Sequence, residues 1–190
     1  MIKKLILIVL ALFVFTIPSG CSPWRYENDY KGEIIDADTG KPIEGVVVLG
    51  MWFKSYISPA GSSEKFYDAR EAVTDDIGEF SIPGMGLLIF SNIDESINVL
   101  IFKAGYKYIG PGTWREFIDI SIPNKNSKSK SDIAIIPLKK LTMKERKKIG
   151  DPKWRLSAQI PDAKIKLMLK EINKDRRERG LKPSSRGNKK

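Results

Sequence analysis

Between residues 30 and 138 the chain is a series of short apolar runs separated by turn residues, and this pattern constrains the fold more than any other feature. Short runs rich in β-branched and aromatic side chains predict strands. The predicted strands lie at 32–36, at 45–49, on both sides of a turn within 72–82, and at 97–103, 117–122 and 132–138. About seven strands suit two packed sheets, so we expect an all-β sandwich.

Local signals refine this expectation. Asp38 is expected to bond the turn after the first strand, where Gly40 supplies a positive φ. Strict alternation predicts that Ile118, Ile120 and Ile122 point inward from one strand. Residues 50–69 and 83–96 are expected to form two long connections, and either could carry a functional loop.

Three motifs in this region resemble one known family. They are Gly32-x-Ile34-x-Asp36 continued by Thr39-Gly40-x-Pro42-Ile43-x-Gly45-Val46-x-Val48, then Thr74-Asp75-x-x-Gly78-x-Phe80, and then Gly105-Tyr106. The pattern is similar to the carboxypeptidase regulatory-like domain. The resemblance implies a seven-stranded, two-sheet transthyretin-like (prealbumin-like) β-sandwich over residues 30–138, in which these positions are structural.

The N-terminus has the pattern of an export signal. Lys3 and Lys4 precede thirteen uncharged, mostly aliphatic residues at 5–17. A helix of that length rises about 20 Å, which is short of the roughly 30 Å hydrocarbon core of a bilayer. We therefore expect residues 1–20 to be a signal peptide that is cleaved before Cys21, with residues 21–29 as a short linker.

Ser19-Gly20-Cys21 resembles a lipobox, although Pro18 stands where that pattern has an aliphatic residue. The resemblance implies that Cys21 is lipidated and anchors the protein in a bacterial envelope. In lipoproteins, an aspartate directly after the lipidated cysteine is linked to retention in the inner membrane. This chain has Ser22 at that position, so the resemblance favours the outer membrane, facing the periplasm. Ordinary secretion with a free Cys21 and an uncleaved N-terminal anchor are the alternatives.

The chain has no histidine, and Cys21 is its one cysteine. This composition excludes His-ligated zinc sites, His-dependent nucleophile pairs and an internal disulfide. The carboxylates show no spacing that pairs them for acid–base work. The Asp-rich segments at 36–40 and 75–78 read as turns, with a calcium loop as the alternative. We expect no enzyme, no cofactor and no metal site.

Two sets of residues are candidate interaction surfaces. An aromatic set at 51–67 could stack on sugars or anchor a protein, or could belong to the core of a long hairpin. Its members are Trp52, Phe53, Tyr56, Phe66 and Tyr67. A basic set could contact anionic lipid or another envelope polyanion. Its members are Lys164, Lys166, Lys170, Lys174, Arg176 and Arg177.

The basic set lies in a tail, residues 139–190, that holds 19 Lys and Arg against 6 Asp and Glu, whereas residues 21–138 hold 12 against 17. The Thr142-x-x-Glu145 spacing predicts a helix that ends at Gly150. A second helix is expected from Pro161 to Gly180, and disorder from about residue 181. Ile165, Met168, Leu169 and Ile172 share one face of that helix.

The tail could dock on the acidic sandwich, lie on a membrane or bind a protein partner, while export argues against nucleic acid. The expected function is that of a lipid-anchored envelope protein whose non-catalytic sandwich has a structural or interaction role. The alternatives are an accessory subunit of an envelope complex and a carbohydrate-binding module that uses the 51–67 loop.

Overall fold

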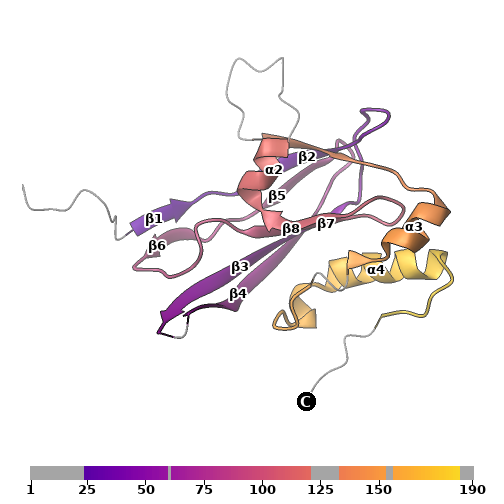
Figure 1. Cartoon of the computed structure of the whole chain (residues 1–190). Coiled ribbons are helices and arrows are strands. Elements are labelled where there is room, and N and C mark those ends of the chain that lie inside the picture. The colour runs from indigo at the N-terminus through magenta and orange to yellow at the C-terminus, as the bar shows by residue number, and fades with distance from the viewer. Residues whose placement is uncertain (1–23, 60, 121–132, 153–155, 185–190) are drawn as a thin grey trace, which may run out of the picture. The chain divides into compact units, whose positions relative to one another are not determined.

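The computed structural model describes residues 24–59, 61–120, 133–152 and 156–184 (Figure 1). The chain divides into a small unit, Met1–Glu27 with Met85–Ser91, and a large unit, Asn28–Gly84 with Asn92–Lys190. Each unit is described by itself. Strands dominate the described residues of both units, so the expected all-β class is confirmed.

The described residues of the large unit form seven strands in two sheets. The first sheet has the order β5-β2-β9, in which β2 pairs antiparallel with β5 and parallel with β9. Its strands are β2 (Tyr30–Asp36), β5 (Glu79–Ile82) and β9 (Ile133–Leu138). The second sheet is antiparallel with the order β4-β3-β7-β8. Its strands are β3 (Val47–Ser58), β4 (Gly61–Val73), β7 (Asn98–Phe102) and β8 (Ile109–Thr113).

A core of aromatic and aliphatic side chains joins the two sheets. Tyr30 on β2 contacts Trp52 on β3 and Trp114, at ring-centroid distances of 6.3 Å and 5.5 Å. Gly50 allows close approach, because a β-carbon there would lie 3.3 Å from the side chain of Ile82 on β5. Alternate residues of β3 therefore point into a sandwich.

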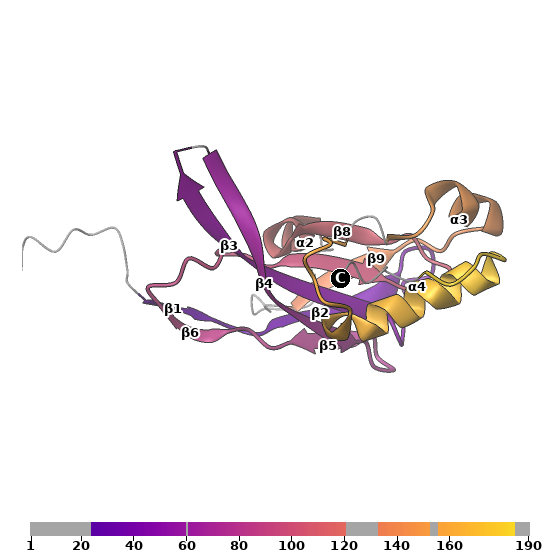
Figure 2. The ribbon, with the colours of Figure 1, turned by 90° about the horizontal axis from the view of Figure 1, so that it is seen from below.

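The other face of the four-stranded sheet is covered by the C-terminal segment, so the first half of β3, from Val47 to Trp52, is buried on both faces. In this layer α4 (Lys166–Glu178) lies against β3 and β7 (Figure 2). The sheet contributes Val47, Leu49, Met51, Ala69, Leu100 and Phe102, and the C-terminal segment contributes Leu156, Ile160, Ile165, Met168 and Ile172. Docking of the tail on the sandwich, one of the expected arrangements, is present.

The strand predicted at 117–122 is wrong where the structure describes it, because Trp114–Ile120 forms a helix, α2. Phe117 is buried and Ile118 is exposed, the reverse of the expected alternation. Trp114 and Phe117 are spaced i, i+3, so one helical face brings both rings to the core, where they stack at 6.4 Å. Ile122 lies outside the described residues. The seventh strand of the sandwich is β8 instead.

Both predicted connections contain strands. Residues 50–69 are the outer part of the β3–β4 hairpin, which pairs continuously from Val47↔Val73 to Ser58↔Gly61 with one register shift after Trp52. The connection at 83–96 contains β6 (Gly86–Ile89). The linker at 21–29 contains β1 (Trp24–Glu27), which pairs antiparallel with β6 and forms the described part of the small unit.

The turn after β2 forms at the predicted place, but Asp36 supplies its acceptor. Its Oδ1 accepts the backbone N–H groups of Asp38 at 3.0 Å and Thr39 at 2.9 Å. Gly40 has the expected positive φ of 68°. Assignment of the acceptor role to Asp38 was wrong, because a side chain in such a turn bonds the N–H groups two and three residues after it.

The predicted start of the first tail helix and the predicted stops at Gly150 and Gly180 are confirmed, but the start of the second helix at Pro161 was wrong, because α4 (Lys166–Glu178) begins after a 3-10 turn. Thr142 and Glu145 form a capping box at the start of α3 (Met143–Ile149), which ends at Gly150. Pro161 precedes a single 3-10 turn, η2 (Asp162–Lys164), and α4 follows. Gly180, with φ of 75°, ends α4 in a Schellman motif, in which the Leu181 N–H donates to the Arg176 carbonyl at 2.8 Å.

The prediction of disorder from about residue 181 was wrong for residues 181–184, which are ordered. The backbone N–H of Ser184 donates to Asn173 Oδ1 at 2.6 Å, and Arg176 Nε donates to the Lys182 carbonyl at 2.8 Å. Residues 181–184 therefore fold back along α4. Residues 185–190 lie outside the described part of the chain.

Candidate functional site

The predicted aromatic set divides between the core and the surface. Trp52 is 1% exposed and points into the sandwich, where the Arg70 guanidinium lies 5.1 Å from its ring. Phe53 and Phe66 pair edge to face at 6.2 Å and pack against the C-terminal layer. These three residues belong to the core of a long hairpin. This was the alternative to a binding surface in the sequence analysis.

Tyr56 and Tyr67 form the exposed part of the set, with 40% and 44% of their surfaces open to solvent. Each ring lies beneath a lysine of the opposite strand. Lys65 Nζ is 5.3 Å from the Tyr56 ring, and Lys54 Nζ is 4.1 Å from the Tyr67 ring. These cation–π contacts place a mixed aromatic and cationic surface on the outer hairpin.

A shallow cavity of about 290 Å³, near the lower size limit of small-ligand pockets, lies between the β3–β4 hairpin and the C-terminal segment. It is lined by Met51, Phe53, Glu64, Asn98, Pro111, Ser157 and Gln159. Gln159 is fixed in place, because its Oε1 accepts the backbone N–H of Phe66 at 2.9 Å. An aromatic edge, a carboxylate, two amides and a hydroxyl converge here, which is the donor and acceptor chemistry that a sugar can use.

The predicted basic set is only partly available to a partner. Lys164 pairs with Asp68 at 2.8 Å, Lys174 with Glu171 at 3.6 Å, and Arg176 with Asp151 at 2.6 Å. The other three residues are exposed and form no ion pair within the part of the chain that the structure describes; they are Lys166, Lys170 and Arg177. An anion could contact this smaller basic surface, whereas Lys164 and Arg176 join the C-terminal segment to β4 and to the loop after α3, and Lys174 pairs within α4.

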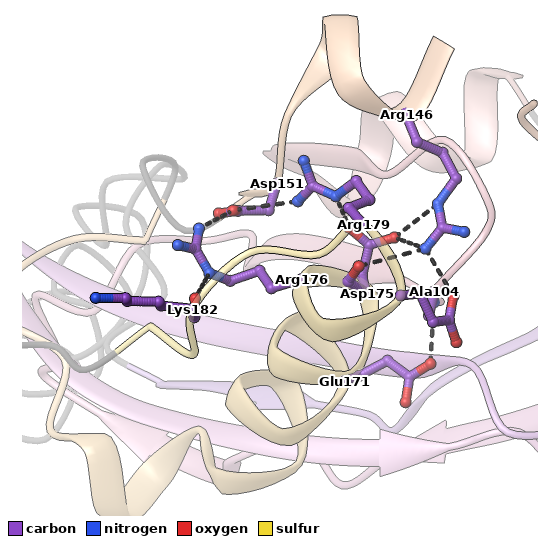
Figure 3. Close-up of polar contacts among 9 residues, drawn as sticks. Ala104, Arg146, Asp151, Glu171, Asp175, Arg176, Arg179 and Lys182 are labelled. Carbon is purple, nitrogen blue, oxygen red and sulfur yellow. Dashed lines mark hydrogen bonds and ion pairs between the residues drawn. The ribbon is translucent and has the colours of Figure 1, made fainter. Parts of the chain in front are cut away.

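A buried ion-pair network joins α3 and the loop after it to α4 (Figure 3). Arg146 on α3 pairs with Asp175, with Nε 3.0 Å from Oδ1, and with Glu178 at 2.7 Å. Asp151 Oδ2 lies 2.6 Å from Arg176 Nη1 and 3.3 Å from Arg179 Nη2.

Asp175 connects the two halves of this network, because its Oδ2 also forms an ion pair with Arg179 Nε at 2.7 Å. The geometry of this contact does not meet the criteria for a hydrogen bond. Sequence reasoning named Arg176, as a possible anion contact, and missed the other residues of the network. The i, i+4 spacing of Asp175 and Arg179 is the one local signal that could have indicated part of the network. Its role is structural, because its charges face one another and are largely buried.

Glu71 on β4 also has a structural role. Its carboxylate accepts the backbone N–H groups of Leu167 at 2.9 Å and Met168 at 2.6 Å, so it caps the start of α4. Ile165, at the N-cap position, provides no side-chain hydrogen bond of its own. Burial raises the pKa of Glu71, and the bonds from the helix N–H groups oppose that rise.

The Asp75 turn likewise uses its carboxylate internally. Asp75 Oδ1 accepts the Glu79 backbone N–H at 2.8 Å, and Gly78 takes a φ of 77°. Among the described residues, no three Cys, Asp or Glu side chains gather where they could hold one metal ion.

Cys21 lies outside the described residues. None of the helices in the described part of the chain combines the length and the apolar character needed to cross a bilayer. Comparisons of the chain with protein-family models, with curated protein sequences and with solved structures gave no match.

Proposed function

We propose that this protein is an exported bacterial lipoprotein whose β-sandwich serves as a non-catalytic interaction module at a membrane. One observation carries the proposal. A basic start and an apolar run of signal-peptide length end at Ser19-Gly20-Cys21, which contains the only thiol of the chain. Two or more acyl chains on Cys21 would anchor the protein stably, since each buried methylene contributes about 0.8 kcal/mol.

The sandwich of this lipoprotein is, in this proposal, a transthyretin-like domain of the carboxypeptidase regulatory-like type. Seven strands in a three-stranded and a four-stranded sheet support it. The motif residues also have structural roles. Gly40 and Gly78 take positive φ, and the Tyr106 hydroxyl donates to Asp36 Oδ2 at 3.3 Å, which links two of the three motifs.

The test of the lipoprotein is the chemistry of the mature N-terminus. The full-length protein, produced in a bacterium with two membranes, is expected to begin at an acylated Cys21 by mass spectrometry. It should sediment with the outer membrane. The Cys21→Ser variant should retain its leader and incorporate no labelled palmitate. A wild-type protein with an unmodified Cys21, or with Met1 still present, would refute the proposal.

The cavity beside the outer hairpin supports a second candidate function, binding of carbohydrate by the sandwich. We expect the wild-type protein to be retained on an array of envelope glycans. Retention should be lost in Glu64→Gln and kept in Lys170→Gln, a substitution on the distant surface of α4. Equal retention of both variants, or of neither wild type nor variant, would exclude this candidate.

A further inference from the structure

The small unit presents an apolar face to solvent. β1 and β6 pair so that Trp24 lies opposite Ile89 and Tyr26 lies opposite Leu87. Directly paired residues share a face of the ladder, and so do residues two apart on one strand. These four side chains therefore form one surface, and they are 57% to 66% exposed. We call it the β1–β6 apolar face.

The β1–β6 apolar face contains no ionisable group other than the Tyr26 phenol. The residues between its members, Arg25, Leu88 and the buried Glu27, alternate onto the opposite side of the ladder. Phe90 extends the apolar character beyond Ile89; it is 86% exposed and has a positive φ of 46°. A contiguous exposed surface of this kind marks a contact with a membrane or another apolar partner.

The position of the face in the chain selects a membrane as that partner. Trp24 is three residues from Cys21, a span of at most about 11 Å for extended chain. Acyl chains on Cys21 would hold the start of β1 within that distance of the headgroups. Trp and Tyr concentrate in this layer, because their rings are apolar and their tips are polar. Aliphatic side chains beside them can reach the acyl boundary.

We infer that the β1–β6 apolar face lies in the headgroup layer of the bilayer that holds Cys21, as a second membrane contact beside the acyl anchor. This inference rests on the proposed lipoprotein for the choice of partner. The acyl chains supply attachment, and the face fixes how the start of the folded chain meets the lipid.

Tryptophan quenching tests the contact in the full-length protein purified in detergent and reconstituted into vesicles. The vesicles contain phosphatidylethanolamine and phosphatidylglycerol with brominated acyl chains. Trp52 and Trp114 are buried in the sandwich, so they should be insensitive to the bromines. Trp154, the fourth tryptophan of the chain, lies outside the described residues, so it is replaced by phenylalanine in every protein compared. We expect quenching in the wild type, and its loss in Trp24→Leu identifies Trp24 as the quenched residue.

A second pair of variants separates the face from other exposed side chains. In Leu87→Ser/Ile89→Ser, Trp24 keeps its place while its apolar neighbours are lost, and its quenching should fall several-fold. Tyr56→Ser/Tyr67→Ser removes exposed aromatic residues of the large unit and should leave quenching unchanged. Near-ultraviolet circular dichroism checks that every variant retains the fold. Unquenched Trp24 in wild-type vesicles would overturn the inference and would indicate a protein partner instead.

The mass of the N-terminus, measured on the same sample, separates this inference from the proposed function. An acylated Cys21 with unquenched Trp24 would leave the lipoprotein standing and refute the second contact. Quenched Trp24 with an unmodified Cys21 would refute the lipoprotein, and it would show that the face meets lipid without an anchor.

Discussion

The carboxylate of Glu71, on β4, lies 2.6 Å from the backbone nitrogen of Met168, in the first turn of α4. A sheet residue thus caps a helix that starts 95 positions later in the chain. The cap satisfies N–H groups that the helix cannot satisfy itself, and it places a negative charge at the positive end of the helix dipole. The contact therefore fixes where α4 begins on the sheet.

Glu71→Ala should lower the free energy of unfolding by about 0.5–2 kcal/mol, because the α4 cap is lost. Urea unfolding of the full-length protein in mild detergent measures this change. Glu64→Ala, on the exposed part of the same strand, is the control and should change stability by less than about 0.5 kcal/mol. Equal effects of the two substitutions would contradict the cap.

Asp175→Ala should be among the most damaging single changes in the tail. It leaves Arg146 and Arg179 buried without their shared carboxylate, and breaking a buried pair in this way costs about 3–5 kcal/mol. The same urea experiment measures the loss. Combining Arg146→Met with Asp175→Ala should cost less than the sum of the two single variants, and strict additivity would mean that the pair is not coupled.

Trp52→Ala and Tyr56→Ala should behave differently, although both come from the predicted aromatic set. Trp52 fills the sandwich core, so its loss should cost about 3–5 kcal/mol. Tyr56 is exposed above Lys65, and its loss should change stability by about 0.5 kcal/mol or less. Thermal unfolding of both variants decides the point, and a stable Trp52→Ala would place that ring outside the core.

Acid should weaken the turn after β2. The backbone N–H of Thr39 is the main cause that lowers the pKa of Asp36 below 3.8, and a bond from the Tyr106 hydroxyl acts in the same direction. A lowered pKa contributes stability above the unfolded-state value, and this contribution is lost as the pH falls through the folded-state value. Urea midpoints measured from about pH 6 to about pH 2 should therefore fall less steeply in Asp36→Asn than in the wild type.

Asp38→Asn is the matched control for this pH dependence. It changes a neighbouring carboxylate and leaves the acceptor of the turn in place, so its urea midpoints should follow the wild-type slope. A flattened slope in Asp38→Asn and a wild-type slope in Asp36→Asn would reverse the assignment of the acceptor.

Signals contained within a few residues predicted the structure well. The capping box of Thr142 and Glu145 depends on a spacing of three, and the stop at Gly180 depends on a single φ, so neighbouring residues determine both. Strands β2, β7 and β9 were predicted close to their bounds because their apolar runs are buried in the sandwich. The composition of each run was sufficient in these cases.

The α2 helix shows how a local signal was missed. Thr113 and Glu116 have the same spacing as Thr142 and Glu145, and their side chains bond at 3.1 Å. The alternation of isoleucines after residue 117 favoured a strand, but the i, i+3 pair of Trp114 and Phe117 determined which face is buried. A helix start was therefore present in the sequence, and the apolar periodicity was assigned to the wrong element.

Contacts between distant segments lay beyond the sequence patterns. The pairing of β1 with β6 joins residues about sixty positions apart, and both strands are too short to show a clear period. The outer half of β4 is polar because it is exposed, so it was assigned to a connection. The network around Asp151 and Arg146 depends on the packing of α3 beside α4, which no spacing of charges determines.

The double burial of β3 has a consequence for biosynthesis. The residues that cover its outer face, Leu156 to Ile172, leave the ribosome after all nine described strands. A nascent or truncated chain that stops before Ile172 leaves part of this apolar sheet surface exposed. Chaperones bind such surfaces, and proteases degrade chains that expose them. The sheet is therefore protected from chaperones and proteases only after α4 has been synthesised and has packed against it.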